Sequence, residues 1–530
     1  MAYSSFCVKI ELMRNNSKQQ NQCTVKEQHG QLVFALNSEI LLPENAPVRL
    51  TSAQLEELDY EKLYRAYSPR GRKSKVDPRV MFKVMVYGYQ CGIYSSRKLE
   101  EACRYRIDFK WLLEDGKGPD HTTFARFRTG RCLEAVEDLF YQYVKLLEKQ
   151  GETDHETVFV DGTKLESSAG RYTFCWRGRV EKQLEKVREK VFRLTGLKKL
   201  TELHGCLEQQ QKEIVFVHGK GKHKSEEQRR WEELYELFRR WEGYETSLNI
   251  MGESRNSYSK TDPDATFMRM KDDHMRNGQL KPAYNVQIAV NSEYITGIDV
   301  FSNRTDFGTL VPFLKQLQQH HECRYKEVTA DAGYESLENY LFLEENGQVR
   351  FIKPANYEAQ KTKKFRKQIG RIENMTYHAD ENCFACAEGK KLSLRRETTE
   401  LQDGHFVSTA YYRCDKCEGC PSRSRCCQAK DPNKPKEVIL KKTFWEKRAQ
   451  SQANITTERG IYLRMCRSIQ VEGAFALLKN DFGFRRFLTR GRQNVRTELF
   501  FLAMAFNLKK LWMKRENGRL KTHLSEIQVA

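Results

Sequence analysis

The pattern of apolar and polar residues predicts short helices from Pro47 to about Lys149. The segment VDPRVMFKVMVYGYQCG carries an apolar stripe at helical spacing, with Asp77 placed as a cap and Pro78 at the first helical position. SSRKLEEACRY and PDHTTFARFRTGR open two further helices, and CLEAVEDLFYQYVKLLEKQ follows them. The first forty or so residues show no sustained period, which predicts a loosely packed arm.

Beyond residue 157 the pattern predicts strands that alternate with helices. The segments that read as strands are TVFVD, YNVQIAVN, ITGIDVFS, YKEVTADAGY and VRFIKP. Helices are predicted from about Asp306 to His320, over ESLENYLFLEEN, and in a long region from about Thr457 to Met513. Without its insertions, this order is the one expected of an α/β, RNase H-like domain, a mixed sheet flanked by helices.

Two insertions interrupt this order. Residues from Arg179 to about Gly243 are charged and helix-rich, which predicts a helical insertion, read as a hairpin of two helices around the loop HGKGKHK. The polar stretch SRNSYSKTDPDATFMRMKDDHMRNGQL predicts a loop. We therefore expect an arm (1–44), a helical domain (45–150), an α/β domain (151–178, 280–377 and 455–515), a helical insertion and loop (179–279), a small Cys-rich insertion (378–430) and a tail (516–530).

Charge points to a polyanionic partner. The chain has 91 basic and 71 acidic residues and a formal net charge of +20, and contacts of Lys or Arg with phosphates release condensed counterions. Composition alone favours an ordinary helical bundle over a DNA-binding one for residues 47–149. No window is long and apolar enough to span a bilayer, and no secretory signal is evident, so a cytoplasmic location is expected.

Three acidic residues form a candidate catalytic set. Asp161 ends the first strand, Asp331 ends the fourth, and Glu472 lies on the last helix. Cleavage of a phosphodiester is assisted by two hard cations, which take carboxylate oxygens as ligands. Each acid also has a structural interpretation: a turn residue, a helix cap and a solvated helix residue, respectively. Asp299, mid-strand, and Asp306, which reads better as a helix cap, compete for a role, and spacing does not decide between them.

The chain resembles the DDE insertion-sequence transposases. The resemblance rests on VFVDGTKLESSAGRYTFCW, YNVQIAVNSEYITGIDVFSNRTDFGTLVPFL, TADAGYES and VEGAFALLKNDFGFRRFLTRG. It runs from about Asn45 to Leu511 and is closest to the branch with an InsH-like helical N-terminal domain and a cysteine-rich segment before the last catalytic helix. It implies that Asp161, Asp331 and Glu472 are catalytic and hold Mg²⁺ or Mn²⁺.

One feature departs from the family pattern. Related transposases carry an Arg four residues before the Glu, and that position here is Ser468. Arg467 or Arg464 is left to serve in its place. The family Lys, seven residues after the Glu, matches Lys479, which lies on the same helix face as Glu472.

Basic residues beyond the Glu are candidate DNA contacts. Arg485, Arg486, Arg490 and Arg492 are interleaved with Phe482, Phe484 and Phe487. We expect the aromatic residues to be mainly core and the arginines mainly phosphate contacts. Arg467, and Arg126 and Arg128 of the helical N-terminal domain, complete the predicted DNA-binding set.

Seven of the sixteen cysteines fall between residues 383 and 427. The pairs C-F-A-C and C-D-K-C have the spacing that lets two thiolates reach one tetrahedral Zn²⁺. Cys383, Cys386, Cys414 and Cys417 would make one complete set, and Cys420, Cys426 or Cys427 could replace members of the second pair. The alternative is a group of reduced thiols that packs a small insert.

The sequence thus predicts a DNA transposase that cleaves insertion-sequence ends and transfers the freed 3′-hydroxyl into target DNA. Its expected partners are the terminal inverted repeats and the target DNA, with a homodimer or larger assembly on paired ends and a nucleoid association in a bacterial cell. A metal-dependent DNA nuclease without strand transfer is the enzymatic alternative. A catalytically silent, domesticated DNA-binding protein is the other.

Overall fold

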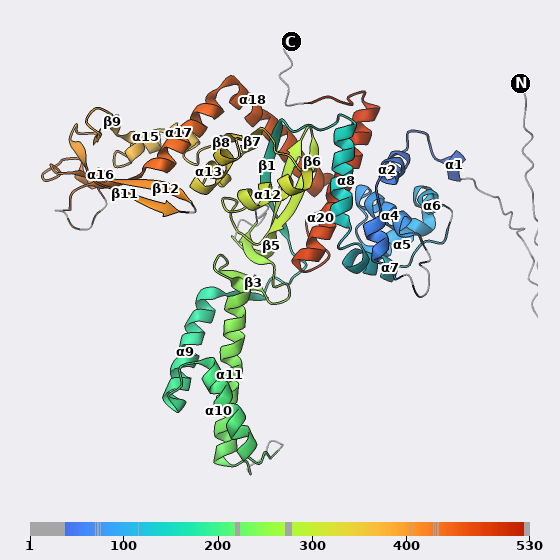
Figure 1. The fold of residues 1–530 in the computed structure, drawn as a ribbon, viewed down its shortest axis with the longest axis horizontal. Coiled ribbons are helices and arrows are strands. Elements are labelled where there is room, and N and C mark those ends of the chain that lie inside the picture. Colours follow the sequence, from blue (N-terminus) through green and yellow to red (C-terminus); the bar gives the residue numbers. More distant parts are fainter. Residues whose placement is uncertain are drawn as a thin grey trace, which may run out of the picture.

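The computed structural model describes residues 38–68, 70, 74, 76–114, 116–217, 223–270, 278–402, 404–427, 429, 431 and 434–523. The predicted arm therefore lies largely outside the described residues. Parts of the basic segment RGRKSK (70–75) and of the loop HGKGKHK (218–224) lie outside them as well. A mixed sheet occupies the centre of the molecule, with the N-terminal helices on one side and the cysteine-rich part on the other (Figure 1). Within the described ranges, no helix is both long and apolar enough to cross a membrane.

The central sheet is mixed, as predicted. Its strands are β1 (Thr157–Glu166), β4 (Thr266–Arg269), β5 (Leu280–Asn291), β6 (Tyr294–Phe301), β7 (Glu327–Ala330) and β8 (Val349–Ile352), in the order β4-β5-β1-β7-β8 with β6 also paired to β5. β1 is antiparallel to β5 and parallel to β7, and β7 is parallel to β8. β1 is longer than predicted, so Asp161 lies within the strand, opposite Ile288 of β5.

Successive side chains of β1 point alternately to the two faces of the sheet and contribute to the apolar core on each face. Val158 and Val160 pack with α12 (Leu310–His321) and α13 (Leu337–Glu345) on one face. Phe159 packs into the other core, which includes α20 (Arg492–Glu516). Because successive side chains of a strand point to opposite faces, a run of apolar residues such as 158–160 is buried on both sides.

The N-terminal helices pack against α20. They are α1 (Ser38–Leu41), α2 (Pro47–Glu56), α3 (Glu61–Arg65), α4 (Pro78–Gln90), α5 (Ser96–Tyr105), α6 (Ile107–Leu112), α7 (His121–Arg126), the π-helical turn η1 (Phe127–Arg131) and α8 (Val136–Lys149). The predicted cap of α4 is confirmed, since the Asp77 carboxylate accepts a hydrogen bond from Arg79 N. The buried faces of α4 and α8 contact α20 directly, so this helical unit and the sheet share one core.

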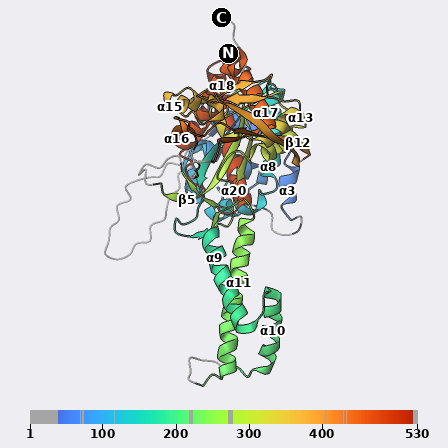
Figure 2. The same cartoon turned by 90° about the vertical axis from the view of Figure 1, so that its left-hand side faces the viewer.

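The helical insertion consists of three helices rather than the predicted two. α9 (Arg177–Thr195), α10 (Leu200–Glu213) and α11 (Glu226–Met251) form their own apolar core and extend away from the body (Figure 2). A two-stranded sheet of β2 (Phe174–Trp176) and β3 (Ser257–Ser259) lies at their base. The stretch predicted as a loop contains β3 and β4, and its residues 271–277 lie outside the described part of the chain.

The cysteine-rich insertion is built on a second sheet, which the sequence did not predict. Its antiparallel strands follow the order β13-β12-β11-β10-β9. They are β9 (Thr376–His378), β10 (Cys383–Ala385), β11 (Lys391–Gln402), β12 (His405–Cys414) and β13 (Glu437–Lys441), preceded by the short helices α14 (Tyr357–Gln360), α15 (Lys363–Arg366) and η3 (Ile372–Asn374), with α16 (Arg423–Cys426) between β12 and β13.

The chain returns to the central sheet through a series of consecutive helical segments. Its parts are α17 (Lys442–Thr456), α18 (Glu458–Arg467), η4 (Ser468–Glu472), α19 (Gly473–Ala476) and η5 (Leu477–Asp481). Both η4 and η5 are π-helical turns, a form that occurs mostly as single turns within α-helices and often at functional sites.

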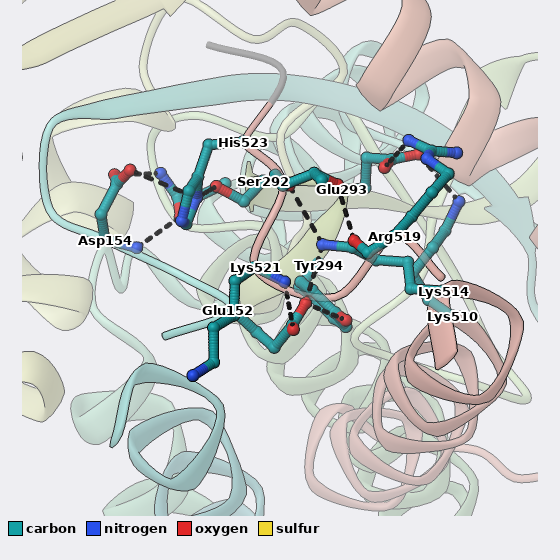
Figure 3. A network of polar contacts seen from close by, with 12 residues as sticks. Glu152, Asp154, Ser292, Glu293, Tyr294, Lys510, Lys514, Arg519, Lys521 and His523 are labelled. Carbon is teal, nitrogen blue, oxygen red and sulfur yellow. Dashed lines mark hydrogen bonds and ion pairs between the residues drawn. The ribbon is translucent and has the colours of Figure 1, made fainter. Parts of the chain in front are cut away.

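The end of α20 is fastened to the sheet by a buried polar network (Figure 3). Lys514 Nζ lies 2.7 Å from Glu152 Oε2, and both side chains are 2% exposed. Tyr294 Oη also donates to the Glu152 carboxylate. Arg519 and Lys510 bind Glu293 in the β5–β6 turn. The C-terminal helix is thereby tied to the segment before β1 and to the β5–β6 turn.

Candidate active site

The strand register brings Asp161 and Asp331 together. In the parallel pair β1–β7, Val160 lies opposite Ala330. Asp161 directly follows Val160, and Asp331 directly follows Ala330. Neighbouring strands lie about 4.8 Å apart, and matched positions point to the same face. Asp331, predicted to end its strand, is the first residue after β7 and caps the short turn η2 (Ala332–Tyr334).

A guanidinium group lies between the two carboxylates. Arg467 Nη2, at the end of α18, is 2.9 Å from Asp161 Oδ2 and 3.9 Å from Asp331 Oδ2. The Arg467 and Asp161 side chains are 14% and 9% exposed, whereas that of Asp331 is 39% exposed. The site is therefore a pair of acids that opens to solvent on the Asp331 side and is bridged by a cation.

Backbone groups also fix both carboxylates. Asp161 Oδ1 accepts a hydrogen bond from Gly162 N at 2.8 Å, and Asp331 Oδ1 accepts one from Gly333 N at 2.8 Å. Gly162 must remain small, because an added Cβ would lie 2.4 Å from Gln287 Nε2 and 2.7 Å from Asp306 Oδ1. This crowding is a reason for glycine directly after the first aspartate.

A polar layer supports the aspartates, and the sequence interpretation missed it. Asp306 Oδ1 accepts hydrogen bonds from Asn285 Nδ2 at 2.7 Å and Gln287 Nε2 at 3.1 Å. Tyr334 Oη donates to Gln287 Oε1 from a fully buried position, and burial raises the pKa of Tyr334 well above its usual value. The prediction that Asp306 caps its helix is wrong, because α12 begins at Leu310, after Thr309.

Glu472 lies on η4, the turn that follows Arg467, but it does not join the aspartates. Its side chain is exposed, whereas Gln470 and Val471 of the same turn are buried. Gln470 Oε1 accepts a hydrogen bond from Glu293 N at 2.9 Å, which holds η4 against the β5–β6 turn. Within the described part of the chain, no three Cys, His, Asp or Glu side chains form a group that could hold a metal ion.

The π-helical turn explains the spacing of Arg467 and Glu472. They are five residues apart, and hydrogen bonds in a π-turn run from residue i to i+5. Residues five apart across such a turn therefore occupy successive turns of one helix face, as residues four apart do in an α-helix. Arg464, the other candidate, instead places its guanidinium 5.6 Å from the Tyr357 ring centroid.

Asp299, the remaining acidic candidate, is held in ion pairs with two arginines. Asp299 Oδ1 binds Arg496 Nε at 2.7 Å, and its Oδ2 lies 3.7 Å from Arg492 Nη2. Arg496 also contacts Glu137 of α8 at 2.6 Å. Asp299 thus belongs to an ion-pair network that joins β6, α8 and α20.

The arginines between η5 and α20 lie on a loop fastened to the end of β1. Arg486 donates from Nε to Ser167 O and from Nη2 to Ala169 O, both at 3.0 Å, and Arg490 Nε donates to Ser168 O at 3.2 Å. Arg485 and Arg492 are exposed, and Lys479 is half-buried in η5. As expected, the interleaved aromatics Phe482, Phe484 and Phe487 are buried.

The two N-terminal arginines are placed differently from each other. Arg126 is exposed at the end of α7. Arg128 is 4% exposed, donates to Tyr94 O at 2.6 Å and lies over the Tyr89 ring. Its guanidinium is thus engaged inside the helical unit, away from the surface that DNA could reach.

Thiols gather in the second sheet around a small cavity of about 20 Å³. Its lining includes six cysteines, namely Cys386, Cys414, Cys417, Cys420, Cys426 and Cys427, together with Lys390, Leu392, Arg423 and Lys436. Cys383 is not among them; it is buried in β10 with its thiol directed to Glu381. Lys436 N donates to Cys417 Sγ at 3.4 Å, and burial raises the pKa of Cys414 to about 11.

Comparison with known proteins gives two family matches. Residues 385–512, which include Arg467, Glu472 and the six cavity cysteines, match the family described as "Transposase DDE domain". Residues 36–130 match the family described as "Transposase domain (DUF772)". No curated protein and no solved structure gives a significant match.

Both matched families are transposases, which defines the class of this protein. The N-terminal and DDE matches together place the chain among the insertion-sequence DDE transposases. Membership implies DNA as a partner and a family chemistry that generally uses divalent metal ions.

Proposed function

We propose that this protein is a metal-dependent DNA transposase whose catalytic residues are Asp161, Asp331 and Glu472. One observation carries the proposal: two carboxylates from neighbouring parallel strands flank a cation in a site that opens to solvent. The reaction would be hydrolysis of the phosphodiester at the insertion-sequence end, followed by attack of the freed 3′-hydroxyl on target DNA.

The strand order supports an RNase H-like catalytic domain. Strands β1, β5 and β6 occur in this order along the chain and pair antiparallel, β4 adds an edge strand beside β5, and β7 and β8 extend the sheet parallel to β1. The predicted helical and cysteine-rich insertions would leave this sheet intact, because the first enters between β1 and β5 and the second follows β8. The catalytic residues would then come from two strands and one helix.

The donor set fits hard divalent cations. Carboxylate oxygens suit Mg²⁺ or Mn²⁺, and Arg467 shows that the space between Asp161 and Asp331 accepts positive charge. Bound there, such ions would make a nucleophilic oxygen more acidic and stabilise the leaving oxygen. Asp161 and Asp331 would hold them, and Glu472 would complete one coordination shell after a local movement of η4.

Basic residues around the site would hold the DNA. Lys479, Arg485, Arg490 and Arg492 lie on or directly after the segment that carries Glu472, so phosphates bound there would lie beside the acids. Arg467, once released from the aspartates, could contact the phosphate nearest the cut. The N-terminal helices, with Arg126 exposed, would read the inverted repeat, and paired ends would require at least a dimer.

The sulfur-lined cavity is the proposed place for a structural Zn²⁺. Thiolates are preferred zinc ligands, and the cavity has room for about one small ion or water. We favour Cys386, Cys414 and Cys417 with one of Cys420, Cys426 and Cys427 over the set that includes Cys383, because Cys383 lies outside the lining. The thiols would have to close in on the ion, since they are not already arranged around one.

The test is a joining assay with a labelled insertion-sequence end and a supercoiled target, in Mg²⁺ or Mn²⁺. The wild type should give cleaved and joined products, and Asp161→Asn, Asp331→Asn and Glu472→Gln should each give neither while still binding the end. Cleavage without joining would favour the nuclease alternative. Binding with no cleavage by the wild type would favour the silent DNA-binding alternative.

A further inference from the structure

The second sheet has one buried and one open face. Leu392, Tyr412 and Val438 belong to its apolar core, on the face that packs inside the insert. On the opposite face, Tyr411 lies across from Ile439, which is 62% exposed, and Arg413 lies across from Glu437. Antiparallel sheets commonly leave one face to solvent, so the feature of interest is the charge that this face carries.

A β-bulge concentrates arginines on this open face. The register between β11 and β12 shifts between Leu394 and Arg396, which leaves Arg395 as the extra residue. Simple alternation would send Arg395 and Arg396 to opposite faces. Because a bulge re-aims its side chains, both arginines instead line the same cavity.

The cavity over this face is open and strongly basic, with a volume of about 610 Å³. Its charged lining residues are Arg395, Arg396, Arg413, Lys434, Lys436 and Glu437. Five cations against one carboxylate leave an excess of four positive charges among the lining residues that the structure describes. We call this surface the basic platform.

The charges of the basic platform remain available to a ligand. Arg413 lies 3.8 Å from Glu437, with both side chains about half exposed, and such surface ion pairs contribute little. Arg395 has a comparable exposed pairing with Asp415. Arg396 stacks 4.1 Å from the Tyr411 ring centroid, which orders its guanidinium without neutralising it.

The basic platform is rigidly joined to the candidate active site. α17 packs on both β12 and β8, and it leads directly into α18, which ends at Arg467. The basic platform also adjoins the small cavity lined by six cysteines, because Cys427 lines both. DNA held on the basic platform would therefore have a fixed position relative to the catalytic sheet.

From these observations we infer that the basic platform binds the phosphate backbone of duplex DNA, as a second DNA-binding surface separate from the N-terminal helices and from the segment after Glu472. The inference rests on the proposed function for the identity of its ligand. An excess of guanidinium groups on an open face matches the charge and the fork geometry of phosphate recognition. An acidic protein partner is the other outcome of the test.

The experiment compares full-length wild type with R396Q/R413Q for binding to end-containing duplex DNA over a range of salt concentrations. Each phosphate contact contributes about 0.9 to the slope of log K against log salt. Loss of two contacts should lower the slope by about 1.8 and weaken binding several-fold or more at about 0.1 M salt. Cleavage at saturating DNA should fall much less than binding.

The matched control is K190Q/R193Q on α9, which removes two equally exposed charges from the helical insertion. It should keep the wild-type slope. An unchanged slope in R396Q/R413Q, or an equal loss in the control, would overturn the inference, and binding of an acidic protein instead would do the same. If the wild type itself binds no end DNA, the proposed function fails; if it binds and cleaves while R396Q/R413Q matches it, only this inference fails.

Discussion

Removal of the Arg467 guanidinium should make the protein bind divalent cations more tightly. In the structure this group lies between Asp161 and Asp331, in the space proposed for the metal. A cation must therefore displace it, and the affinity of the wild type is reduced by the free energy of the ion pairs that are broken. In Arg467→Met no such displacement occurs, and the two carboxylates are left with unrelieved repulsion, which acts in the same direction.

The size of the effect follows from burial. Removing one partner of a buried, hydrogen-bonded charge pair typically costs about 2–5 kcal/mol. The Asp161 contact is short and shielded, but the Asp331 contact is long and its carboxyl is 39% exposed, so the lower part of that range applies. A displacement cost of about 2–3 kcal/mol corresponds to about 30- to 140-fold tighter binding in the variant, since about 1.4 kcal/mol is tenfold.

Calorimetric titration of DNA-free protein with Mn²⁺ measures this directly, and the metal-dependent rise in melting temperature gives a second readout. Arg485→Gln is the matched control, because it removes an exposed arginine from the same region and should leave the Kd unchanged. Arg467→Met/Asp161→Asn should bind poorly. Equal Kd values for folded Arg467→Met and the wild type would refute the displacement argument.

Three further outcomes are expected. Glu152→Gln should lower the melting temperature at pH 7, equivalent to about 3–5 kcal/mol, because it leaves the Lys514 ammonium buried without its anionic partner. Burial raises the pKa of Glu152, but the hydrogen bond and charge of Lys514 outweigh this and hold that pKa below its usual value. The ion pair therefore stabilises the folded state above about pH 4.3. The difference in melting temperature between wild type and Glu152→Gln should close as the pH falls through the pKa of Glu152 in the folded protein. Gly162→Ala should reduce cleavage at least about tenfold with a smaller loss of stability, because its Cβ would displace Gln287 or Asp306 behind the aspartates; wild-type cleavage would contradict the crowding seen there. Cys414→Ser should lose bound zinc in metal analysis of purified protein, whereas Cys206→Ser on α10 should keep it.

Local patterns predicted the strands of the central sheet other than β4, because those strands are apolar enough to be recognised one at a time. The end of β1 was missed, since Gly162, Thr163 and Lys164 break the apolar run. Those residues are strand because they pair with 285–287 of β5, more than a hundred residues away. Long-range pairing of this kind leaves no local signal.

The second sheet was missed for a related reason. β11 reads KLSLRRETTELQ, in which polar residues occupy most positions of both faces. Only its first part contributes to a core, and the bulge at Arg395 breaks even that alternation. The density of cysteines was visible in the sequence, but which of them share a cavity depends on how β10, β12 and α16 meet.

The role of Asp306 could not be read from its neighbours either. An aspartate shortly before a helix is an ordinary N-cap, and nothing near it indicates another environment. Its partners Asn285 and Gln287 come from alternate positions on β5 and lie opposite Lys164 and Gly162, so they share the face of the sheet behind the one that carries Asp161. Polar residues at alternate positions of an otherwise apolar strand were the available signal.

The place of Arg467 shows how one added residue can be accommodated in a catalytic helix. By spacing alone, the position four before Glu472 is Ser468, and a regular α-helix would turn Arg467 away by about 100°. η4 absorbs the extra residue as a π-turn, so Arg467 reaches both aspartates while Gln470 and Val471 stay buried. The same turn leaves Glu472 exposed on a segment whose helical hydrogen bonding is already irregular. Because the π-turn already keeps Glu472 on the helix face that carries Arg467, a displacement of η4 toward the sheet, rather than its return to α-geometry, is the change that would bring the third acid toward the other two.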